Sequence, residues 1–485
     1  MKQLNRQNFE AQKHPTKIMQ FGEGNFLRAF IDWQIDYLNK HTGLAAGVSI
    51  IRPIDYDSLP LLNTQDGLYT TLVRGINEAG EPIEQTSIVE CVNEEIPVYT
   101  QFNQFMELAE LETMQLIFSN TTEAGIAYCE TDKLDDAPAS SYPGKLTQWL
   151  YRRYQYFAGK DEAGLTIIPC ELIDYNGEKL KEIVLQYCEL WQLESQFVDW
   201  LVNANHFCST LVDRIVTGFP KDEHAELQVK LGYADNFMVT CEYFHLFVIQ
   251  GPKSLESLLC PPNSELNIKI VDDIFPYKQR KVAILNGAHT ALVPLAFMSD
   301  LDSVGEAISD PLFERYVEKL VAEEVIPTLD LDKTELESFA RDVISRFKNP
   351  YVQHMLLSIA LNSMTKFKTR LLPQLLKYVT QQNRVPTKMA LALAAQILMY
   401  RGIRNNETIA LNDAPRWLET FVTLWKEFDT GISSERDIVC AVLSAKWHWD
   451  IDLTQVPGLV DAVDTALQQM LKTGVRATLQ QWMEG

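Results

Sequence analysis

The chain has 485 residues, and 43 lysine and arginine residues against 65 aspartate and glutamate residues give it a formal net charge of −22. This acidic balance argues against nucleic acid or an anionic membrane surface as a partner, because both attract a basic face. At the usual ~100–200 residues per domain, the length predicts two large domains or three small ones.

Short apolar runs alternate with amphipathic segments in the first third of the chain, and each run predicts a buried strand. The runs occupy residues 17–21, 47–52, 114–119 and 165–170. Between them, residues 26–38 carry aromatic side chains at helical spacing, and residues 143–157 form a second helical stretch. Strands separated by helices predict an α/β fold with a Rossmann-like, doubly wound sheet.

Two further runs, residues 68–75 and 86–92, flank the turn-rich stretch NEAGEP and predict an antiparallel pair of strands.

The pattern changes after about residue 255, and from residue 281 onward nearly every segment has helical periodicity. These segments are residues 281–297, 312–327, 335–347, 354–367 and 388–401. The stretch 260–267 carries proline and serine and suits a linker or an edge loop. We therefore expect one domain over residues 1–255 and a mainly α-helical domain over residues 256–485. The motifs described below make the first the dinucleotide-binding domain and the second the substrate and catalytic domain.

A glycine turn joins the first strand to the first helix. Gly22 would allow a tight turn, Gly24 would let the backbone approach a pyrophosphate, and the helix N-terminus would offer free N–H groups. Arg28, one turn into the helix, is placed to meet a phosphate or to stack on a cofactor. Leu27 stands where a third glycine usually lies, so an ordinary strand-to-helix turn is the alternative to a nucleotide site.

The second strand ends at Arg52, where dinucleotide-binding folds usually carry an acidic residue for the ribose. Arg52 would suit a 2′-phosphate, and the acidic Asp55 follows only three positions later, so the spacing leaves NAD and NADP open. The third strand is followed by Ser119, Asn120, Thr121 and Thr122, and this strand end is expected to face the cofactor.

Three polar residues, Lys281, Asn286 and His289, lie in a strongly apolar helical segment. On an ideal helix all three fall on one side, and Asn286 and His289 are neighbours at a spacing of three. The set suits reduction of a ketone, with a lysine as proton donor, an amide to stabilise the growing oxyanion and a histidine to orient a substrate hydroxyl. The alternative is a buried helix whose polar side chains satisfy loop carbonyls.

The residues G-x-G-x-F-x-R at 22–28 and K-x4-N-x2-H at 281–289 resemble the polyol-specific long-chain dehydrogenases of the mannitol dehydrogenase family. The segments QDGLYT (65–70), TTEAG (121–125), PCELIDYNG (169–177) and RFKNP (346–350) agree with this family, and the resemblance covers nearly the whole chain. Within the family the likeness is strongest to members that interconvert D-tagaturonate and D-altronate in hexuronate catabolism.

The resemblance implies an NAD-dependent oxidoreductase with a small-molecule sugar acid as substrate, whose active site lies in a cleft between the two domains. It implies that Lys281 is the acid/base, that Asn286 donates to the oxyanion and that His289 binds substrate. The family's cofactor loop maps onto Ile18, Met19, Gln20, Phe21, Gly22, Glu23, Gly24, Asn25, Phe26, Leu27, Arg28 and Ala29, with Asn120 and Thr121 added from the third strand end.

One departure concerns the oxyanion. Mannitol-type members carry an asparagine directly after the acidic residue of a C-D/E-N motif, whereas this chain has Cys170, Glu171 and Leu172. The second donor is therefore missing, or it comes from Asn176 or a neighbouring strand end. For the substrate carboxylate we expect Arg346 or Lys366 as the pairing cation, with plain surface solvation of both as the alternative.

The sequence carries no pattern typical of a membrane protein, a secreted protein or a zinc site. The chain has no run of about 18 apolar residues and no signal peptide at its start, so we expect a cytoplasmic protein with no membrane partner. The eight scattered cysteines predict reduced thiols, and the absence of zinc spacing predicts no metal. Fructuronate reductase, a mannitol-type enzyme and a non-catalytic nucleotide-binding protein remain alternatives, and the sequence leaves the oligomeric state open.

Overall fold

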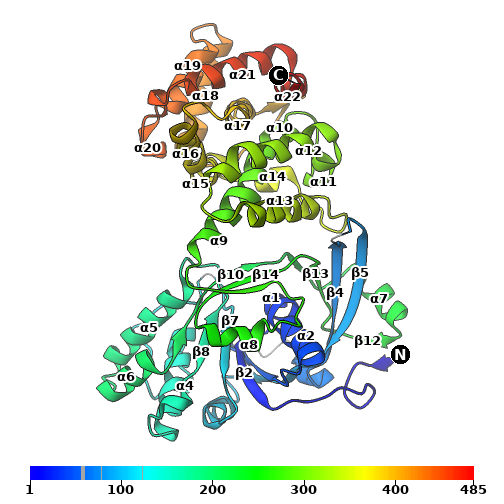
Figure 1. Ribbon diagram of the computed structural model, residues 1–485, viewed down its shortest axis with the longest axis vertical. Coiled ribbons are helices and arrows are strands. Elements are labelled where there is room, and N and C mark those ends of the chain that lie inside the picture. The colour runs from blue at the N-terminus through cyan, green and yellow to red at the C-terminus, as the bar shows by residue number, and fades with distance from the viewer. Residues whose placement is uncertain (56–59, 78, 123, 485) are drawn as a thin grey trace. The chain divides into compact units, whose positions relative to one another are not determined.

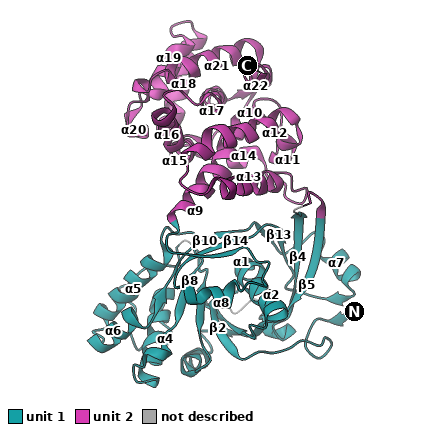
Figure 2. Cartoon of the chain, in the orientation of Figure 1, with its two compact units in different colours: residues 1–77, 83–274 teal, residues 78–82, 275–485 magenta. Residues whose placement is uncertain are grey.

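A computed structural model describes residues 1–55, 60–77, 79–122 and 124–484 (Figure 1). The chain forms two compact units, unit 1 with residues 1–77 and 83–274 and unit 2 with residues 78–82 and 275–485 (Figure 2). The division lies later in the chain than the expected boundary near residue 255. The reason is β15 (Ile268–Val271), which pairs with β14 (Leu246–Gln250) and so keeps the intervening segment in unit 1.

The centre of unit 1 is a six-stranded sheet in the order β6-β3-β2-β7-β8-β9, and each neighbouring pair is parallel. The strands are β2 (Thr16–Phe21), β3 (Gly47–Arg52), β6 (Val92–Pro97), β7 (Leu116–Ser119), β8 (Thr166–Pro169) and β9 (His206–Phe207). Four of them confirm the strands predicted from short apolar runs. The order places β2 in the interior of the sheet, so its carboxyl end has strand ends on both sides.

Both faces of this sheet are covered, as near-continuous apolar strands require. Ile18 of β2 and Phe118 of β7 belong to a core shared with the helical run at residues 25–42, whereas Met19 and Ile117 belong to a core on the other face. The helices that contribute to this second core are α3 (Phe102–Glu107), α4 (Tyr142–Tyr156), α5 (Asn176–Leu190) and α6 (Ser195–Asn203). The alternation follows from the two-residue period of a strand.

Two smaller sheets complete unit 1. One has the order β11-β13-β4-β5 and the other β10-β14-β15. Their strands are β4 (Tyr69–Ile76), β5 (Pro82–Val89), β10 (Ser209–Asp213), β11 (Val216–Gly218) and β13 (Val239–Glu242). The prediction of a strand over residues 86–92 is wrong in its bounds, because β5 ends at Val89 and β6 begins at Val92. The strands between residues 209 and 271 were not predicted from the sequence.

The remaining short elements of unit 1 are β1 (Lys2–Gln3) paired with β12 (Tyr233–Ala234), and the helices α7 (His224–Leu231) and α8 (Glu256–Leu259). The stretch 260–267, expected as a linker, is the connection from α8 to β15 inside this unit.

Unit 2 is almost entirely helical. Its centre is formed by α10 (Gly287–Phe297) and α17 (Thr387–Met399), and every residue of α17 from Met389 onward is buried. The other helices are α9 (Phe275–Arg280), α11 (Val304–Ser309), α12 (Pro311–Lys319), α13 (Lys333–Phe347), α14 (Leu356–Ile359), α15 (Ser363–Arg370), α16 (Leu372–Gln382), α18 (Pro415–Asp429), α19 (Glu435–Leu443), α20 (Lys446–Trp449), α21 (Leu459–Thr473) and α22 (Val475–Glu484). A small hairpin, β16 (Ile403–Arg404) with β17 (Glu407–Thr408), follows α17.

The predicted helical segments of unit 2 are confirmed with one exception. Residues 354–367 do not form one helix, because Asn362 adopts a left-handed backbone (φ 53°) that separates α14 from α15.

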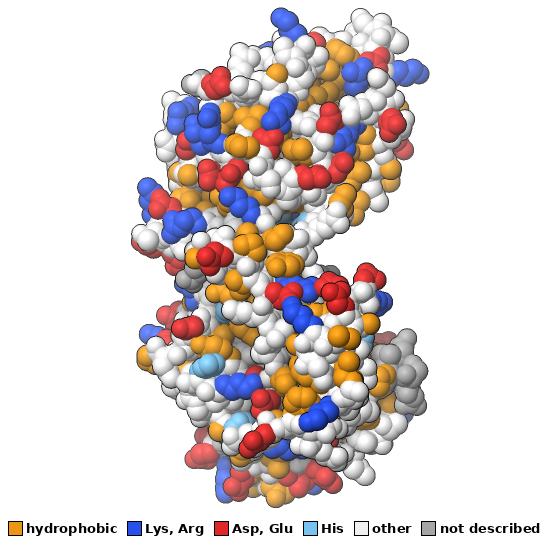
Figure 3. Space-filling model, turned by 90° about the vertical axis from the view of Figure 1, so that its right-hand side faces the viewer, with side chains coloured by type: hydrophobic (Ala, Val, Ile, Leu, Met, Phe, Trp, Pro, Cys, Tyr) orange, Lys and Arg blue, Asp and Glu red, His pale blue; other side chains and the backbone are white. Residues whose placement is uncertain are grey.

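The surface in view in Figure 3 carries acidic and basic side chains interspersed with small apolar areas. Within the described ranges, no helix combines the length and the apolar character that crossing a membrane requires.

Candidate active site

The glycine turn lies at the carboxyl end of β2 and opens the helical run at residues 25–42. Gly22 has φ +112°, donates its N–H to Ile51 O at 2.9 Å, and a Cβ there would lie 3.1 Å from Asn120 O. Only glycine adopts this backbone without strain. The turn therefore has the tight geometry that the sequence predicts, and it is packed directly against the end of β7.

The predicted cofactor loop divides into an accessible tip and a buried support. Glu23, Gly24, Asn25 and Phe26 are the exposed or half-buried residues of the loop, and they carry the first N–H groups of the helical run. The other predicted residues are buried, namely Ile18, Met19, Gln20, Phe21, Gly22, Leu27, Arg28 and Ala29. The tip is the part of this loop that is open to a ligand, and the remainder fixes its shape.

Arg28 belongs to that support. Its guanidinium donates to Glu23 O at 3.1 Å, to Asn25 Oδ1 at 2.7 Å and to Phe237 O at 2.5 Å, and it lies 5.2 Å from the centre of the Tyr69 ring. These contacts tie both ends of the tip to the body of unit 1. The expectation that Arg28 meets a phosphate is replaced by a positioning role.

Beneath the turn, Gln20 donates from Nε2 to Gly22 O at 3.1 Å and lies 3.4 Å from Asp32 Oδ2. Asp32 also accepts from Tyr69 at 3.1 Å, and it is fully buried in η1 (Arg28–Asp32), a wide π turn within the helical run. Burial raises the pKa of Asp32 to about 7 against the hydrogen bonds that lower it. This carboxyl was not singled out from the sequence.

A second carboxyl, Glu171, organises the end of β7, a role that the sequence did not predict. It lies two residues after the end of β8 and accepts from Ser119 Oγ at 3.0 Å and from the backbone N and Oγ1 of Thr121 at 2.9 and 3.0 Å. Asn120 is held alongside by a 3.3 Å bond from Nδ2 to Cys170 O. The predicted polar strand end is therefore next to the glycine turn, and an acidic residue immediately after a buried strand was the available signal for Glu171.

Asn176 does not have the geometry of a substrate-binding residue. It is fully buried, its Nδ2 lies within 3.0 Å of Pro169 O, Glu171 O and Thr210 Oγ1, and its Oδ1 accepts from the backbone N of Gly177 and Thr210. Both amide hydrogens are already used. Asn176 fastens β8 to β10, and it is not available as the second oxyanion donor.

Arg52, at the end of β3, forms ion pairs with acidic side chains. Its Nε and Nη2 lie 2.7 and 2.6 Å from Glu95 Oε1, and Glu23 is 4.0 Å away. The Arg52–Glu95 pair is buried, so removal of either partner would leave an uncompensated charge.

In unit 2, Lys281 and Asn286 are the first and last residues of η6 (Lys281–Asn286), a second π turn, and His289 follows in α10. Across residues 283–297 only Asn286 and His289 are not fully buried. The two side chains therefore share the one open side of this helix. Lys281 is half-buried at the entrance to the same segment, and wide turns of this kind are frequent at functional sites.

His289 lies between aromatic neighbours and cations. Its ring stacks on Phe347 at 4.1 Å and meets His354 edge-on at 5.2 Å, and its Nε2 is hidden from solvent with no hydrogen-bond partner among the described residues. Burial lowers its pKa well below the usual range, and His354 and the cations of Arg346, Arg370 and Lys366 lower it further. His289 is therefore a neutral imidazole at neutral pH.

Both predicted carboxylate partners, Arg346 on α13 and Lys366 on α15, are thus electrostatic neighbours of His289. Both are half-buried, and Lys366 donates to Ile359 O at 2.7 Å.

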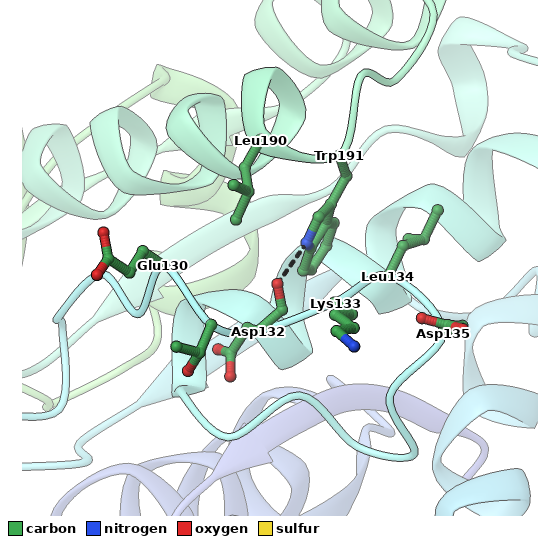
Figure 4. Close-up of a pocket in the computed structure, with 8 residues that line it drawn as sticks. Glu130, Asp132, Lys133, Leu134, Asp135, Leu190 and Trp191 are labelled. Carbon is green, nitrogen blue, oxygen red and sulfur yellow. Dashed lines mark hydrogen bonds between the residues drawn. The ribbon is translucent and has the colours of Figure 1, made fainter.

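Among the described residues, no group of three or more His, Cys, Asp or Glu side chains is placed to hold a metal ion. A cavity of about 460 Å³ lies in unit 1 between residues 130–135 and the end of α5 (Figure 4). Glu130, Asp132 and Asp135 make its lining acidic, and Trp191 Nε1 donates to Asp132 O at 2.9 Å. This lining is unsuited to a pyrophosphate or a sugar acid.

Two family models match in succession, the "Mannitol dehydrogenase Rossmann domain" over residues 16–259 and the "Mannitol dehydrogenase C-terminal domain" over residues 273–471. The chain belongs to the mannitol dehydrogenase family. It is therefore a dehydrogenase, and its parallel sheet with the glycine turn is a Rossmann domain, the kind of fold that binds a dinucleotide at this edge.

The relatives agree with this assignment over the full length. An altronate oxidoreductase of Yersinia enterocolitica is 54% identical over 479 residues, 99% of each chain, and one of Escherichia coli is 55% identical over 476 residues, 98% of this chain and 99% of its own. The fold of this mannitol dehydrogenase family member is similar to that of a substrate-free D-sorbitol dehydrogenase (TM-score 0.79, 20% identity, 99% and 100% of the two chains). It is also similar to Pseudomonas fluorescens mannitol 2-dehydrogenase with NAD and D-mannitol (TM-score 0.64, 20% identity, 99% of each chain).

Proposed function

We propose that the chain is an NAD-dependent oxidoreductase that interconverts D-tagaturonate and D-altronate in the cytoplasm. The observation that carries the proposal is the 54–55% identity, over practically the full length, to enzymes named altronate oxidoreductase. The open side of the helical segment 283–297, where Asn286 and His289 are the residues that are not fully buried, supplies the matching chemistry.

Unit 1 would hold the dinucleotide. The accessible tip formed by residues 23–26 would meet the pyrophosphate, because it carries the first N–H groups and the positive end of the helical run. Arg52 favours NAD over NADP, since Glu95 and Glu23 already surround it and would repel a 2′-phosphate. When bound, NAD supplies or accepts the hydride.

Unit 2 would handle the substrate oxygen. As hydride reaches the ketone carbon, negative charge grows on the oxygen, and Lys281 would give it a proton in reduction and take one in oxidation. The Asn286 amide would donate to the same oxygen and stabilise the charge. His289, a neutral ring with an unpartnered Nε2, would exchange a hydrogen bond with a substrate hydroxyl and carry no net charge in the reaction.

The test follows the nicotinamide absorbance with D-tagaturonate, D-fructuronate and D-fructose, each with NADH and with NADPH. We expect the highest kcat/KM for tagaturonate with NADH. A preference for fructuronate or fructose would reassign the substrate to fructuronate reduction or to a mannitol-type polyol. NADH binding without turnover of any of these substrates would indicate a non-catalytic nucleotide-binding protein.

A further inference from the structure

Four basic side chains gather around His289 in unit 2. Arg346 lies on α13 directly before Phe347, whose ring stacks on His289 at 4.1 Å, and His354 meets the same imidazole at 5.2 Å. Lys366 and Arg370 lie one turn apart on α15, so they point to the same side of that helix. The cluster therefore draws on α13, α15 and the segment before α14.

Arg370 is fixed to the helix that carries His289. Its Nη1 donates to Thr290 Oγ1 at 3.2 Å, and Thr290 in turn donates to Asn286 O at 2.9 Å. The guanidinium is half-buried and fixed at one nitrogen, a geometry that restricts its plane. Through Thr290 it is linked to the same turn that carries Asn286.

The positive charges in this cluster oppose one another. Burial and the charge of Arg370 lower the pKa of Lys366, and burial lowers the pKa of Arg370. The carboxylate of Asp413 also acts on Lys366, but Tyr400 and the backbone N–H groups of Met364 (3.1 Å) and Ala414 (2.7 Å) already donate to it. Repelling cations in a half-buried site are stabilised when an anion binds among them.

We propose that Arg370, Lys366 and His354, together with Arg346, form a receptor for the carboxylate of the substrate and thereby select sugar acids over neutral sugars. The inference rests on the proposed function and extends it by assigning Arg370 and His354 and by giving the cluster a role in specificity. The guanidinium of Arg370 offers parallel N–H groups that match a carboxylate, and the Lys366 ammonium adds a charge one helical turn away.

The position of the cluster suits a substrate that carries its ketone and its carboxylate at different places on one chain. His289 lies three residues from Asn286 on the open side of the helix, and the charges of Arg346, Arg370 and Lys366 lower the pKa of His289. A sugar acid whose carbonyl oxygen reaches Asn286 would direct its carboxylate past the imidazole toward α15. A neutral ketose of the same length would bring no negative charge to Lys366 and Arg370.

The experiment compares Arg370→Met, Lys366→Met and the charge-keeping Arg370→Lys on D-tagaturonate and on the neutral D-tagatose with NADH. Lys368→Met is the matched control, because Lys368 lies on the same helix and pairs at 2.8 Å with Asp450. We expect each methionine variant to lose about 10- to 100-fold in kcat/KM for tagaturonate, mostly through KM, since hydrogen bonds to charged groups have this strength. Tagatose should be affected far less, Arg370→Lys should recover part of the loss, and Lys368→Met should match the wild type.

Equal losses on both sugars, or a loss that appears as a higher KM for NADH, would overturn the receptor. Calorimetric titration with D-altronate in the absence of cofactor separates this inference from the proposed function. A wild type that binds altronate, loses that binding in Arg370→Met and yet reduces no tagaturonate would refute the proposed reaction and support the receptor. Normal tagaturonate turnover in both methionine variants would refute the receptor and leave the reaction in place.

Discussion

Replacement of Asp32 by asparagine should make the protein more stable in neutral and alkaline solution. Asp32 is fully buried beneath the glycine turn, accepts from Tyr69 at 3.1 Å, lies 3.4 Å from Gln20, and has no partner for Oδ1 among the described residues. An asparagine keeps an oxygen that accepts such bonds and has no charge to bury. The change therefore removes an ionisation and preserves the shape.

The magnitude follows from the two pKa values of Asp32. In the unfolded chain the carboxyl ionises near its usual value of 3.8, whereas in the folded protein burial raises the pKa to about 7. Between these values the folded state binds the extra proton, so stability falls as the pH rises from about 4 to about 7 and is constant above. The two pKa values differ by about three, and each pKa unit corresponds to about 1.36 kcal/mol. The ionised carboxylate of Asp32 therefore lowers the free energy of unfolding by up to about 4 kcal/mol.

The measurement is urea unfolding of wild type and Asp32→Asn at several pH values between 5 and 8.5. The variant's advantage should grow with pH and level off above about pH 7. Asp132→Asn is the control of opposite sign, because hydrogen bonds from Ser140 and Ser141 outweigh burial and lower the pKa of Asp132 to about 2, so its loss should destabilise the protein in neutral solution. An Asp32→Asn effect that does not change with pH would refute the reasoning.

Three further predictions concern the site, one of them with a matched control substitution. Gly22→Ala should cost about 1–3 kcal/mol in urea unfolding, because alanine is strained at φ +112° and its Cβ would crowd Asn120 O, whereas Gly24→Ala meets nothing within 4 Å and should unfold like the wild type. Lys281→Ala should lose turnover far more than NADH affinity, and equal losses in a kinetic and binding comparison would reassign Lys281 to the cofactor. Asn176→Ala should lower the urea midpoint by removing buried hydrogen bonds without changing KM for the sugar acid, and a selective rise in KM would restore its role in substrate binding.

Local patterns predicted the parts of this protein that depend on neighbours in sequence. The apolar runs at residues 17–21 and 47–52 became β2 and β3, and the glycine turn between strand and helix has the left-handed backbone that its residue types indicated. The segment 281–297 was predicted as helical from its periodicity, and it forms η6 and α10.

Contacts between distant residues were outside the reach of the pattern. Glu171 orders the end of β7 through Ser119 and Thr121, some fifty positions away in the chain. Its place after a strand could indicate the carboxyl, but not the residues that donate to it. The sequence suggests Asn176 as an amide donor for the substrate, but in the folded chain its amide already donates to Thr210 of β10. The sequence suggests Arg28 as a phosphate ligand, but in the folded chain its guanidinium donates to the backbone oxygen of Phe237.

By itself, the sequence determined the strand and helix periods, the glycine turn, the polar set of Lys281, Asn286 and His289, and a family likeness over nearly the whole chain. The tertiary structure decided which polar side chains remain open to a ligand. Packing placed Arg370 and His354 beside His289 and used up the hydrogen-bonding groups of Arg28 and Asn176. The physical reason is that periodicity records which face of an element is buried, whereas hydrogen bonding and charge depend on which other elements pack against it.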